Sequence, residues 1–306
     1  MANKTIRIGT RDSQLALWQA YTVEKKLNDL GYDTQVIPIK SAGDLILDKP
    51  LYEFGITGIF TKTLDVAMIS GQVDIAVHSM KDVPTALPKG IVQAAVLERE
   101  NSKDILVFNA APDFTQELTI ATGSLRRQAQ WLNRYPHHNV VDLRGNVNTR
   151  LQKLADNDWG GAVFATAGLD RLGIKPENHI DLDWMIPAPA QGAMVVVAMQ
   201  EDAFCVDAVS KLNHLETDIC TLVEREFLRT LEGGCTAPIG ALATVIGNDI
   251  RFEGLLCSVD GQEKIHIEKT TALSHGRNGF GRSCAEEILA NGGASVMEKI
   301  KRDLGK

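Results

Sequence analysis

Segments with the apolar pattern of a strand alternate with segments with the apolar spacing of a helix along the first two thirds of the chain. This alternation restricts the fold more than any other feature. IRIGT is typical of a buried strand, and the following apolar residues recur at helical spacing on one face: Ala16, Ala20, Val23, Leu27 and Leu30. TQVIPI then forms a second predicted strand, which completes a strand–helix–strand unit. The alternation begins again near residue 100, so we predict an α/β fold with parallel strands.

The second series of elements and the length of 306 residues predict more than one domain. DILVF, NVVDL and GAVFAT are predicted strands of a second unit, and VDIAV (73–77) and MVVVAM (194–199) are further apolar strands. From about residue 216 the pattern changes to a long helix, three strand-like segments and a closing helix, which predicts a small α+β domain. Residues 40–58 have no clear period, and we predict a long loop that acts as a lid.

Charge and cysteine content exclude several classes of protein. A net charge of −7 argues against general nucleic-acid binding, which needs a basic face. We find no membrane-length apolar run and no apolar signal region, and five cysteines without CxxC pairs do not form a zinc or disulfide framework. The nucleotide, zinc-protease and serine-hydrolase motifs GxGxxG, HExxH and GxSxG are also absent. We therefore expect a cytoplasmic protein without a metal, a nucleic-acid partner or a membrane.

Polar side chains follow three predicted strands, at the strand ends where α/β proteins bind ligands. The three groups are Arg11 and Ser13; Ser79, Lys81 and Asp82; and Thr122, Ser124, Arg126 and Arg127. Ser13 and Ser124 fit helix N-caps equally well, and the two roles can coexist. From its sequence context alone, Asp82 is better explained as an aspartate in a turn than as a catalytic residue. His78 is likewise better explained as a packed histidine.

The segment from Ala121 to Arg171 contains six arginines and only one lysine. A guanidinium binds carboxylate or phosphate through two parallel hydrogen bonds, whereas lysine serves equally well where only solvation is needed. Solvated helix faces remain an alternative. The strong preference for arginine favours a site for an anion with several negative charges.

Cys235 stands in the sequence LEGGCTAPIG, at the predicted end of a helix with an apolar face formed by Ile219, Val223, Phe227 and Leu231. Gly233 and Gly234 are typical of a helix stop, and Pro238 prevents the helix from resuming. The negative end of a helix dipole disfavours a thiolate, so a protease-like nucleophile is a poor fit. An inert loop cysteine is the simplest interpretation of these residues alone.

Seven stretches, in one order from Gly9 to Gly240, resemble the porphobilinogen deaminase (hydroxymethylbilane synthase) family. They are GTRDSQLALWQ, VDIAVHSMKDVP, SLRRQAQ, LRGNVNTRL, AGLDRLG, QGA and LEGGCTAPIG. The resemblance implies that Cys235 carries a dipyrromethane cofactor through a thioether. It also implies that the enzyme, a transferase of tetrapyrrole (heme) biosynthesis, condenses four porphobilinogen molecules onto this cofactor. Four ammonia molecules are lost, and hydroxymethylbilane is then released.

The resemblance also assigns roles to the polar clusters. Asp82 matches the catalytic aspartate, whose carboxylate can stabilise the azafulvene cation left by ammonia and manage protons. Arginines at matching positions bind the acetate and propionate groups of the pyrroles: Arg11, Arg126, Arg127, Arg144, Arg150 and Arg171. Neighbouring contacts match at Ser13, Ser79, Lys81, Thr122 and Ser124. Arg134 has no match, and we expect it on the surface.

The family fold implies a monomer of three domains, the first two resembling periplasmic binding proteins. Domain 1 would comprise 1–99 and about 194–215, domain 2 would comprise 100–193, and domain 3 would comprise 216–306. The sequence departs from the family at Thr57, Gly123 and Ala190, where relatives usually have lysine, serine and glycine. These changes bear on lid closure and on the pacing of elongation.

Two other functions fit parts of the sequence. A non-catalytic α/β binding protein for a small polyanion would use the same arginines but would need neither Asp82 nor Cys235. Such a protein usually carries an export signal. A cysteine hydrolase is a weaker alternative, because nothing in the sequence near Cys235 would activate its thiol.

Overall fold

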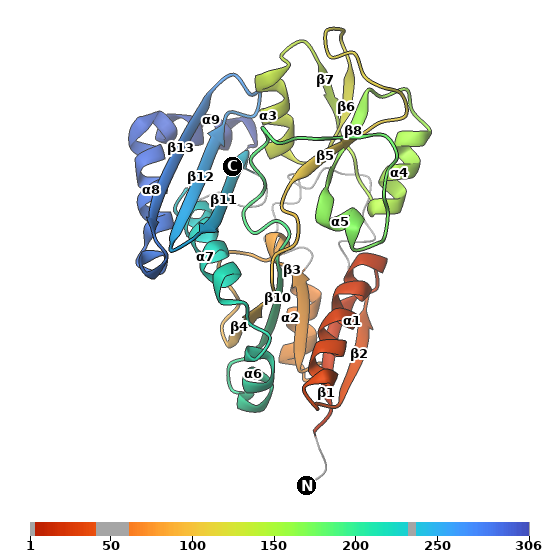
Figure 1. Cartoon of the computed structure of the whole chain (residues 1–306), viewed down its shortest axis with the longest axis vertical. Coiled ribbons are helices and arrows are strands. Elements are labelled where there is room, and N and C mark those ends of the chain that lie inside the picture. The colour runs from red at the N-terminus through yellow and green to blue at the C-terminus, as the bar shows by residue number, and fades with distance from the viewer. Residues whose placement is uncertain (1–3, 41–60, 232–236, 306) are drawn as a thin grey trace.

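The computed structural model describes residues 4–40, 61–231 and 237–305, which form three units (Figure 1). Two α/β units stand one above the other in Figure 1, and the third unit lies beside them. The predicted α/β class with a small C-terminal α+β unit is confirmed. The predicted lid, apart from Lys40, lies outside the described residues, as do Thr57 and Cys235.

The first unit is built on a five-stranded sheet with the order β2-β1-β3-β10-β4. Its strands are β1 (Ile6–Arg11), β2 (Thr34–Ile39), β3 (Ile75–Ser79), β4 (Ile91–Val96) and β10 (Met194–Met199). β1 is parallel to β2 and β3, whereas β10 runs antiparallel to β3 and β4. The chain therefore returns to the first sheet after it has formed the second unit.

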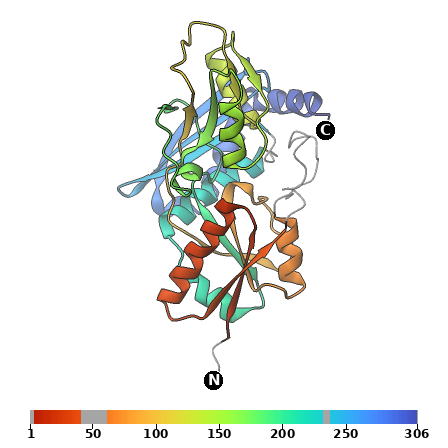
Figure 2. The same ribbon diagram turned by 90° about the vertical axis from the view of Figure 1, so that its right-hand side faces the viewer.

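Helices cover both faces of the first sheet because alternate strand residues point to opposite sides. On one face, α1 (Gln14–Asp29) and α6 (Ala203–Ser210) share a core with Val196 of β10. On the other face, α2 (Lys62–Ile69) packs with the neighbouring Val195. Figure 2 shows α1 and α2 on opposite sides of the strands.

The second unit repeats this arrangement in a sheet with the order β7-β6-β8-β5-β9. Its strands are β5 (Asp104–Val107), β6 (Thr119–Ala121), β7 (Asn139–Val141), β8 (Gly161–Ala165) and β9 (His179–Asp181). β6 is parallel to β7 and β8, and β5 is antiparallel to β8 and β9. Both sheets therefore join three parallel strands to an antiparallel fourth strand.

Three helices flank the second sheet. On one face, α3 (Leu125–Arg134) inserts the buried Trp131 into the core. On the opposite face lie α4 (Val147–Ala155) and α5 (Thr166–Asp170), which contribute Leu154 and Leu169 to a separate core. The parallel strands of both units end towards the region between the two sheets, and this places their following loops near one another (Figure 1).

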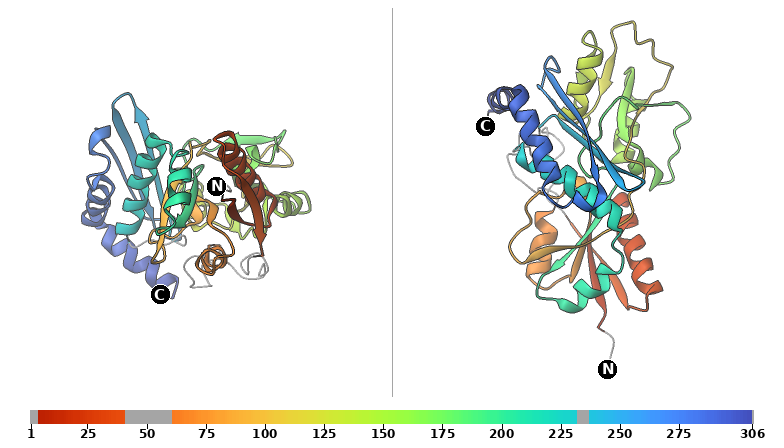
Figure 3. Two further views of the ribbon diagram at one scale, coloured as in Figure 1. Left: turned by 90° about the horizontal axis from the view of Figure 1, so that it is seen from below. Right: turned by 60° about the vertical axis from the view of Figure 1, so that its left-hand side comes forward.

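The third unit packs helices on an antiparallel sheet with the order β11-β12-β13. Its elements are α7 (Leu215–Thr230), β11 (Ile239–Ile246), β12 (Asp249–Cys257), β13 (Lys264–Ala272), α8 (Phe280–Ile288) and α9 (Ala294–Asp303). The predicted apolar face of α7 is confirmed, because its four residues lie in the core of this unit. Figure 3 shows α7 between this sheet and the first unit.

Several sequence predictions are corrected by the structure. The sheets are mixed and not purely parallel, because β5 and β10 run against their neighbours. The strand predicted at 73–77 lies at Ile75–Ser79, and the single closing helix is two helices, α8 and α9. The sequence pattern also missed β4, α2 and α6. The exact domain boundaries stay a prediction.

Two departures from the family pattern have a local structural context. A Cβ atom at Gly123 would lie 2.7 Å from the main-chain oxygen of Leu143, so this backbone fits glycine and not serine. Ala190 has a φ of 63°, in the left-handed region that glycine adopts without cost. It is the one non-glycine residue with positive φ in the described part of the chain.

Candidate functional site

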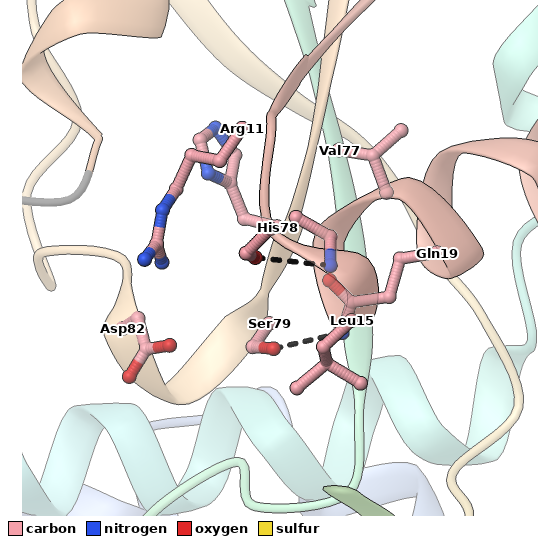
Figure 4. Close-up of a pocket in the computed structure, with 9 residues that line it drawn as sticks. Arg11, Leu15, Gln19, Val77, His78, Ser79 and Asp82 are labelled. Carbon is pink, nitrogen blue, oxygen red and sulfur yellow. Dashed lines mark hydrogen bonds between the residues drawn. The ribbon is translucent and has the colours of Figure 1, made fainter. Parts of the chain in front are cut away.

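A pocket opens at the carboxyl ends of β1 and β3, where two of the predicted polar groups meet (Figure 4). The polar side chains that line it are Arg11, Ser13, Gln19, His78, Ser79 and Asp82. Strand β1 supplies Arg11, and α1 supplies Gln19 and its N-cap Ser13. Strand β3 supplies His78 and Ser79, and the turn after it supplies Asp82. The fold therefore brings together Arg11, Ser13, Ser79 and Asp82, as their positions after strands predict.

Asp82 ends a short 3-10 turn, η3 (Met80–Asp82), that follows β3 directly. The Met80 amide donates to the Ala193 oxygen at 3.0 Å, and the Val83 amide donates to the Met80 oxygen at 3.2 Å. The first bond holds the turn against the chain that enters β10, and the second closes the turn itself. Arg11 and Asp82 both line the pocket, and in Figure 4 the Arg11 guanidinium extends towards the turn that carries Asp82.

On the side of the pocket formed by α1, the polar side chains make hydrogen bonds within the protein. Ser13 caps α1, because its hydroxyl accepts from the Ala16 amide at 3.4 Å. Gln19 donates through Nε2 to the Ser79 hydroxyl at 2.8 Å, which joins α1 to β3. Burial lowers the pKa of His78 from 6.5 to about 4, and the Arg11 charge acts in the same direction. His78 is therefore neutral at pH 7 and adds no positive charge.

Lys81 lies on the opposite side of the η3 turn, at a second pocket between the α/β units. Its Nζ donates to Gln191 Oε1 at 3.2 Å. Burial lowers the pKa of Lys81 from 10.5 to about 8, although the nearby Asp82 carboxylate opposes the shift. The ammonium is therefore mainly charged at pH 7 and titrates just above it.

Arg126 and Arg127 in α3 are both buried and both bind the carboxylate of Asp104. Arg126 Nη2 lies 2.8 Å from Asp104 Oδ2, and Arg127 Nη2 lies 2.7 Å from Oδ1. Their Nη1 atoms donate to the main-chain oxygens of Ile186 and Val163. Arg126 Nε is buried and has no hydrogen-bond partner among the described residues.

This cluster keeps a net positive charge, because one carboxylate opposes two guanidiniums. Burial alone would raise the pKa of Asp104, but the charges of Arg126 and Arg127 outweigh it and hold the pKa well below 3.8. Gln191 Nε2 also donates to Asp104 Oδ1, at 2.9 Å. Since Gln191 also accepts from Lys81, one polar network runs from the turn beside Asp82 to the arginines of α3.

The remaining predicted arginines lie in the second unit. Arg144 is buried after β7, and Arg150 in α4 donates through Nε to the Gly145 oxygen at 2.8 Å. Burial lowers the pKa of Arg150 from 12.5 to about 10, and the charges of Arg127 and Arg144 add to this shift.

Arg171 lines the second pocket and contacts the connections between the α/β units. Its Nε lies 2.7 Å from Glu100 Oε2, and its Nη2 donates to the Gly192 oxygen at 2.7 Å. The sequence could not show that this guanidinium already has an acidic partner.

Two other predictions about side chains have clear outcomes. Ser124 precedes α3, but its side chain makes no capping hydrogen bond, so its predicted cap is wrong. Its amide instead donates to the Thr122 hydroxyl at 3.3 Å. Arg134 is exposed and stacks near Trp184, 4.9 Å from the ring centroid, which confirms its predicted surface position.

Sequence reasoning missed three polar residues of this region: Gln19, Asp104 and Gln191. Asp104 offered a usable signal, because an acidic residue at the start of the apolar run DILVF needs a cationic partner if it is buried. Gln191 belonged to a quoted motif but had no assigned role. Gln19 likewise ended the stretch GTRDSQLALWQ without an assigned role.

The four cysteines in the described part of the chain are buried free thiols: Cys205, Cys220, Cys257 and Cys284. Burial raises the pKa of each to about 12, so they are poor nucleophiles at neutral pH. Among the described residues, no group of three or more His, Cys, Asp or Glu could hold a metal ion. Over the same residues, no helix is long and apolar enough to cross a membrane.

Comparison with known proteins identifies two family models on the chain. Residues 6–207 match "Porphobilinogen deaminase, dipyromethane cofactor binding domain", and residues 219–290 match "Porphobilinogen deaminase, C-terminal domain". Relatives named porphobilinogen deaminase occur in Pelobacter propionicus, with 38% identity over 98% of both chains, and in Desulfitobacterium hafniense, with 39% identity over 99% of both. A relative of that name from Nostoc is 40% identical over 98% of this chain and 95% of its own.

Among solved structures, the methionine-binding protein MetQ aligns with 68% of this chain and 89% of its own, with 12% identity and a TM-score of 0.46. A periplasmic sulfonate-binding protein from Methylobacillus flagellatus aligns with 73% of this chain and 68% of its own. Its identity is 11% and its TM-score is 0.40.

Proposed function

The chain belongs to the porphobilinogen deaminase family, and on this premise we propose that it is a transferase of tetrapyrrole biosynthesis that acts on porphobilinogen. It joins four porphobilinogen molecules on a dipyrromethane cofactor, releases ammonia at each step and sets hydroxymethylbilane free. The observation that carries this proposal is the pocket at the carboxyl ends of β1 and β3, which Arg11 and Asp82 both line.

The cations around the pocket fit a cofactor and a substrate that carry carboxylates. Arg11 lines the Asp82 pocket, and Lys81 and Arg171 line the second pocket between the two units. The buried Nε of Arg126 is a donor that has no acceptor in the described part of the chain. Because each pyrrole carries an acetate and a propionate, we assign these cations, together with Arg127, Arg144 and Arg150, to carboxylate binding.

Asp82 is suited to act on the carbon that loses ammonia. Departure of ammonia leaves positive charge on the substrate, and a carboxylate held by a bonded turn can stabilise that charge without reorganisation. The same carboxylate can accept or return the protons that accompany each condensation. Arg11, which lines the same pocket as Asp82, orients a substrate carboxylate so that the reactive carbon lies near Asp82.

The dipyrromethane cofactor supplies the pyrrole end to which the first substrate is joined. We propose that Cys235 holds it through a thioether, as the family motif LEGGC implies. The buried state of the four described cysteines supports this assignment, since their thiols cannot readily reach or attack a pyrrole. A thioether also resists reduction by the thiols of the cytoplasm, where we place the protein.

We further propose that the protein acts as a monomer with the three domains predicted from the sequence. The cofactor would then be attached to the third domain and bound between the first two. The family match favours this enzyme over the alternative, a non-catalytic binding protein for a small polyanion.

A product assay tests the proposed function. Purified protein is incubated with porphobilinogen, and the ammonia released and the pyrrole consumed are measured together. We expect equal amounts of both and a linear tetrapyrrole product. Tight binding of porphobilinogen without release of ammonia would instead favour the binding protein.

We expect the affinity for porphobilinogen to fall as the pH rises through about 8, because Lys81 then loses its charge. Below this pH the ammonium binds a carboxylate, and above it the neutral amine does not. Lys81→Arg should extend the affinity to higher pH, since a guanidinium stays charged. The measurement is KM between pH 7 and 9 for both proteins. Identical pH profiles would contradict a role for Lys81 in binding.

We expect the arginines to separate by reaction stage. Arg126→Leu and Arg127→Leu should yield protein without cofactor, whereas Arg11→Leu and Arg150→Leu should retain it and lose substrate binding or elongation. Loss of one charge-assisted hydrogen bond costs about 1.5–3 kcal/mol, which is roughly a ten- to hundredfold effect. Cofactor content and steady-state kinetics of each variant measure this separation.

Arg134→Leu is the matched control, because Arg134 is exposed at the end of the same helix. Thermal unfolding must accompany these measurements, since Leu at 126 or 127 also removes a partner of the buried Asp104. If all four substitutions left cofactor content and kinetics unchanged, the site for a polyanion would be refuted.

A further inference from the structure

In the turn that carries Asp82, the Met80 amide donates to the Ala193 oxygen beside β10, and the Val83 amide bonds back to the Met80 oxygen within the turn. Residues 83–90, which follow it, lie in turns and irregular structure before β4 begins. A carboxylate at such a position needs further support if it is to stay aligned with a substrate. That support comes from the third unit.

Arg225 of α7 reaches the turn and donates to three main-chain oxygens. Its Nη1 lies 2.9 Å from the Val83 oxygen and 3.3 Å from the Met80 oxygen, and its Nη2 lies 2.6 Å from the Pro84 oxygen. The accepting carbonyls lie on both sides of Asp82. Because a guanidinium is planar and rigid, it fixes these carbonyls relative to one another as well as to α7.

Helix α7 is a firm support because the residue beside Arg225 is bonded to three other segments. The carboxylate of Glu224 is fully buried and binds both Nη atoms of Arg99 at 2.8 Å. It also accepts from the amides of Ala190 at 2.6 Å and Ala243 at 2.7 Å. The helix therefore cannot slide along the first unit without loss of these buried bonds.

We propose that Arg225 is a positioning residue for Asp82, which holds the turn after β3 in register with α7. The inference rests on the proposed function of Asp82 as the reactive carboxylate. Arg225 acts through the main chain of the turn, and its effect on the reaction is exerted through the placement of the Asp82 side chain. The third unit thereby sets the geometry of a pocket formed by the first.

The test compares Arg225→Gln and Arg225→Lys with Arg229→Gln, an exposed arginine on the same helix. For protein that carries its cofactor, we expect kcat of Arg225→Gln to fall about tenfold or more and KM to change less than about twofold. A displacement of about 1 Å at a reacting group can cost a hundredfold. Arg225→Lys should be intermediate, because an ammonium keeps the charge without the fork, and Arg229→Gln should match the unchanged protein.

A second readout does not depend on the reaction. Amide hydrogen exchange of peptides that cover residues 79–91 should be faster in Arg225→Gln than in Arg229→Gln. A double variant completes the test: Arg225→Gln should have a much smaller effect in an Asp82→Glu background, where the carboxylate is already displaced.

An unchanged kcat in Arg225→Gln would overturn the proposal, and so would faster exchange with unchanged kcat, which would leave Arg225 a structural role alone. An equal loss of kcat on Arg225→Gln in the Asp82 and the Asp82→Glu backgrounds would also overturn it. If Arg225→Gln does not fold, Arg225→Lys carries the test, and a kcat equal to that of the unchanged protein then overturns the proposal. Absence of product from both the unchanged protein and Arg229→Gln would refute the proposed function instead.

Discussion

Asp82→Ala should abolish formation of the bilane while the fold and the attached cofactor are largely retained. The substitution leaves the cation formed on departure of ammonia without its carboxylate, and it removes a proton acceptor from the pocket. Acid–base assistance alone is worth about a hundredfold or more in rate. The expected result is therefore a loss of at least this size in kcat, measured by release of ammonia from porphobilinogen.

Asp82→Asn tests whether the charge of the Asp82 side chain matters apart from its shape. Asp12→Ala tests whether the loss of any nearby aspartate has the same effect. Asn keeps the size of the side chain without the charge, so it should be nearly as inactive as Ala. Asp12 is exposed and follows Arg11 directly, and its replacement should leave turnover unchanged. Near-normal turnover of Asp82→Ala would remove Asp82 from the mechanism.

Cys235→Ser should give a folded protein that carries no durable cofactor and makes no bilane. Serine keeps the approximate shape of cysteine, but its hydroxyl is a poorer nucleophile than the polarisable sulfur of cysteine. Since the cofactor is the acceptor for the first substrate, its loss should reduce turnover to background. Circular dichroism and thermal unfolding would check the fold, and Ehrlich's reagent would report the dipyrromethane.

Cys205→Ser is the matched control, because Cys205 is a buried thiol in the core of the first unit and lies outside the LEGGC motif. It should retain the cofactor and activity even if it loses some stability. A fully active Cys235→Ser protein would return Cys235 to the interpretation of an inert loop cysteine.

The sequence predicted the elements with continuous or strongly periodic apolar character. MVVVAM forms β10 at its predicted bounds, because a fully buried strand is apolar on both faces. The direction of β10 was not predictable, since side-chain period is the same in parallel and antiparallel strands. The short strand β9 (His179–Asp181) is exposed and carries no apolar signal, so the pattern missed it.

The residues of the candidate site were more predictable than their present partners. Motifs and strand ends placed Arg11, Ser79 and Asp82 together, and the pocket contains all three. In contrast, Arg126 and Arg171 already bind Asp104 and Glu100. Such pairs join residues far apart in the sequence, and charge counts along one segment cannot reveal them.

The backbone conformation of Ala190 is another feature that the sequence could not reveal. The sequence indicated only that an alanine replaces a glycine usual in the family. The structure adds its positive φ, which costs alanine about 1 kcal/mol, and a hydrogen bond from its amide to the buried Glu224. The departure therefore lies where the connection to β10 meets α7.

The mass of the intact protein tests the covalent cofactor most directly. We expect active protein to be heavier than the chain alone by two porphobilinogen units less two molecules of ammonia. Peptide mapping should place this addition on the peptide that contains LEGGCTAPIG and on none that contains Cys205, Cys220, Cys257 or Cys284. An unmodified mass in fully active protein, or the addition on another cysteine, would contradict the account.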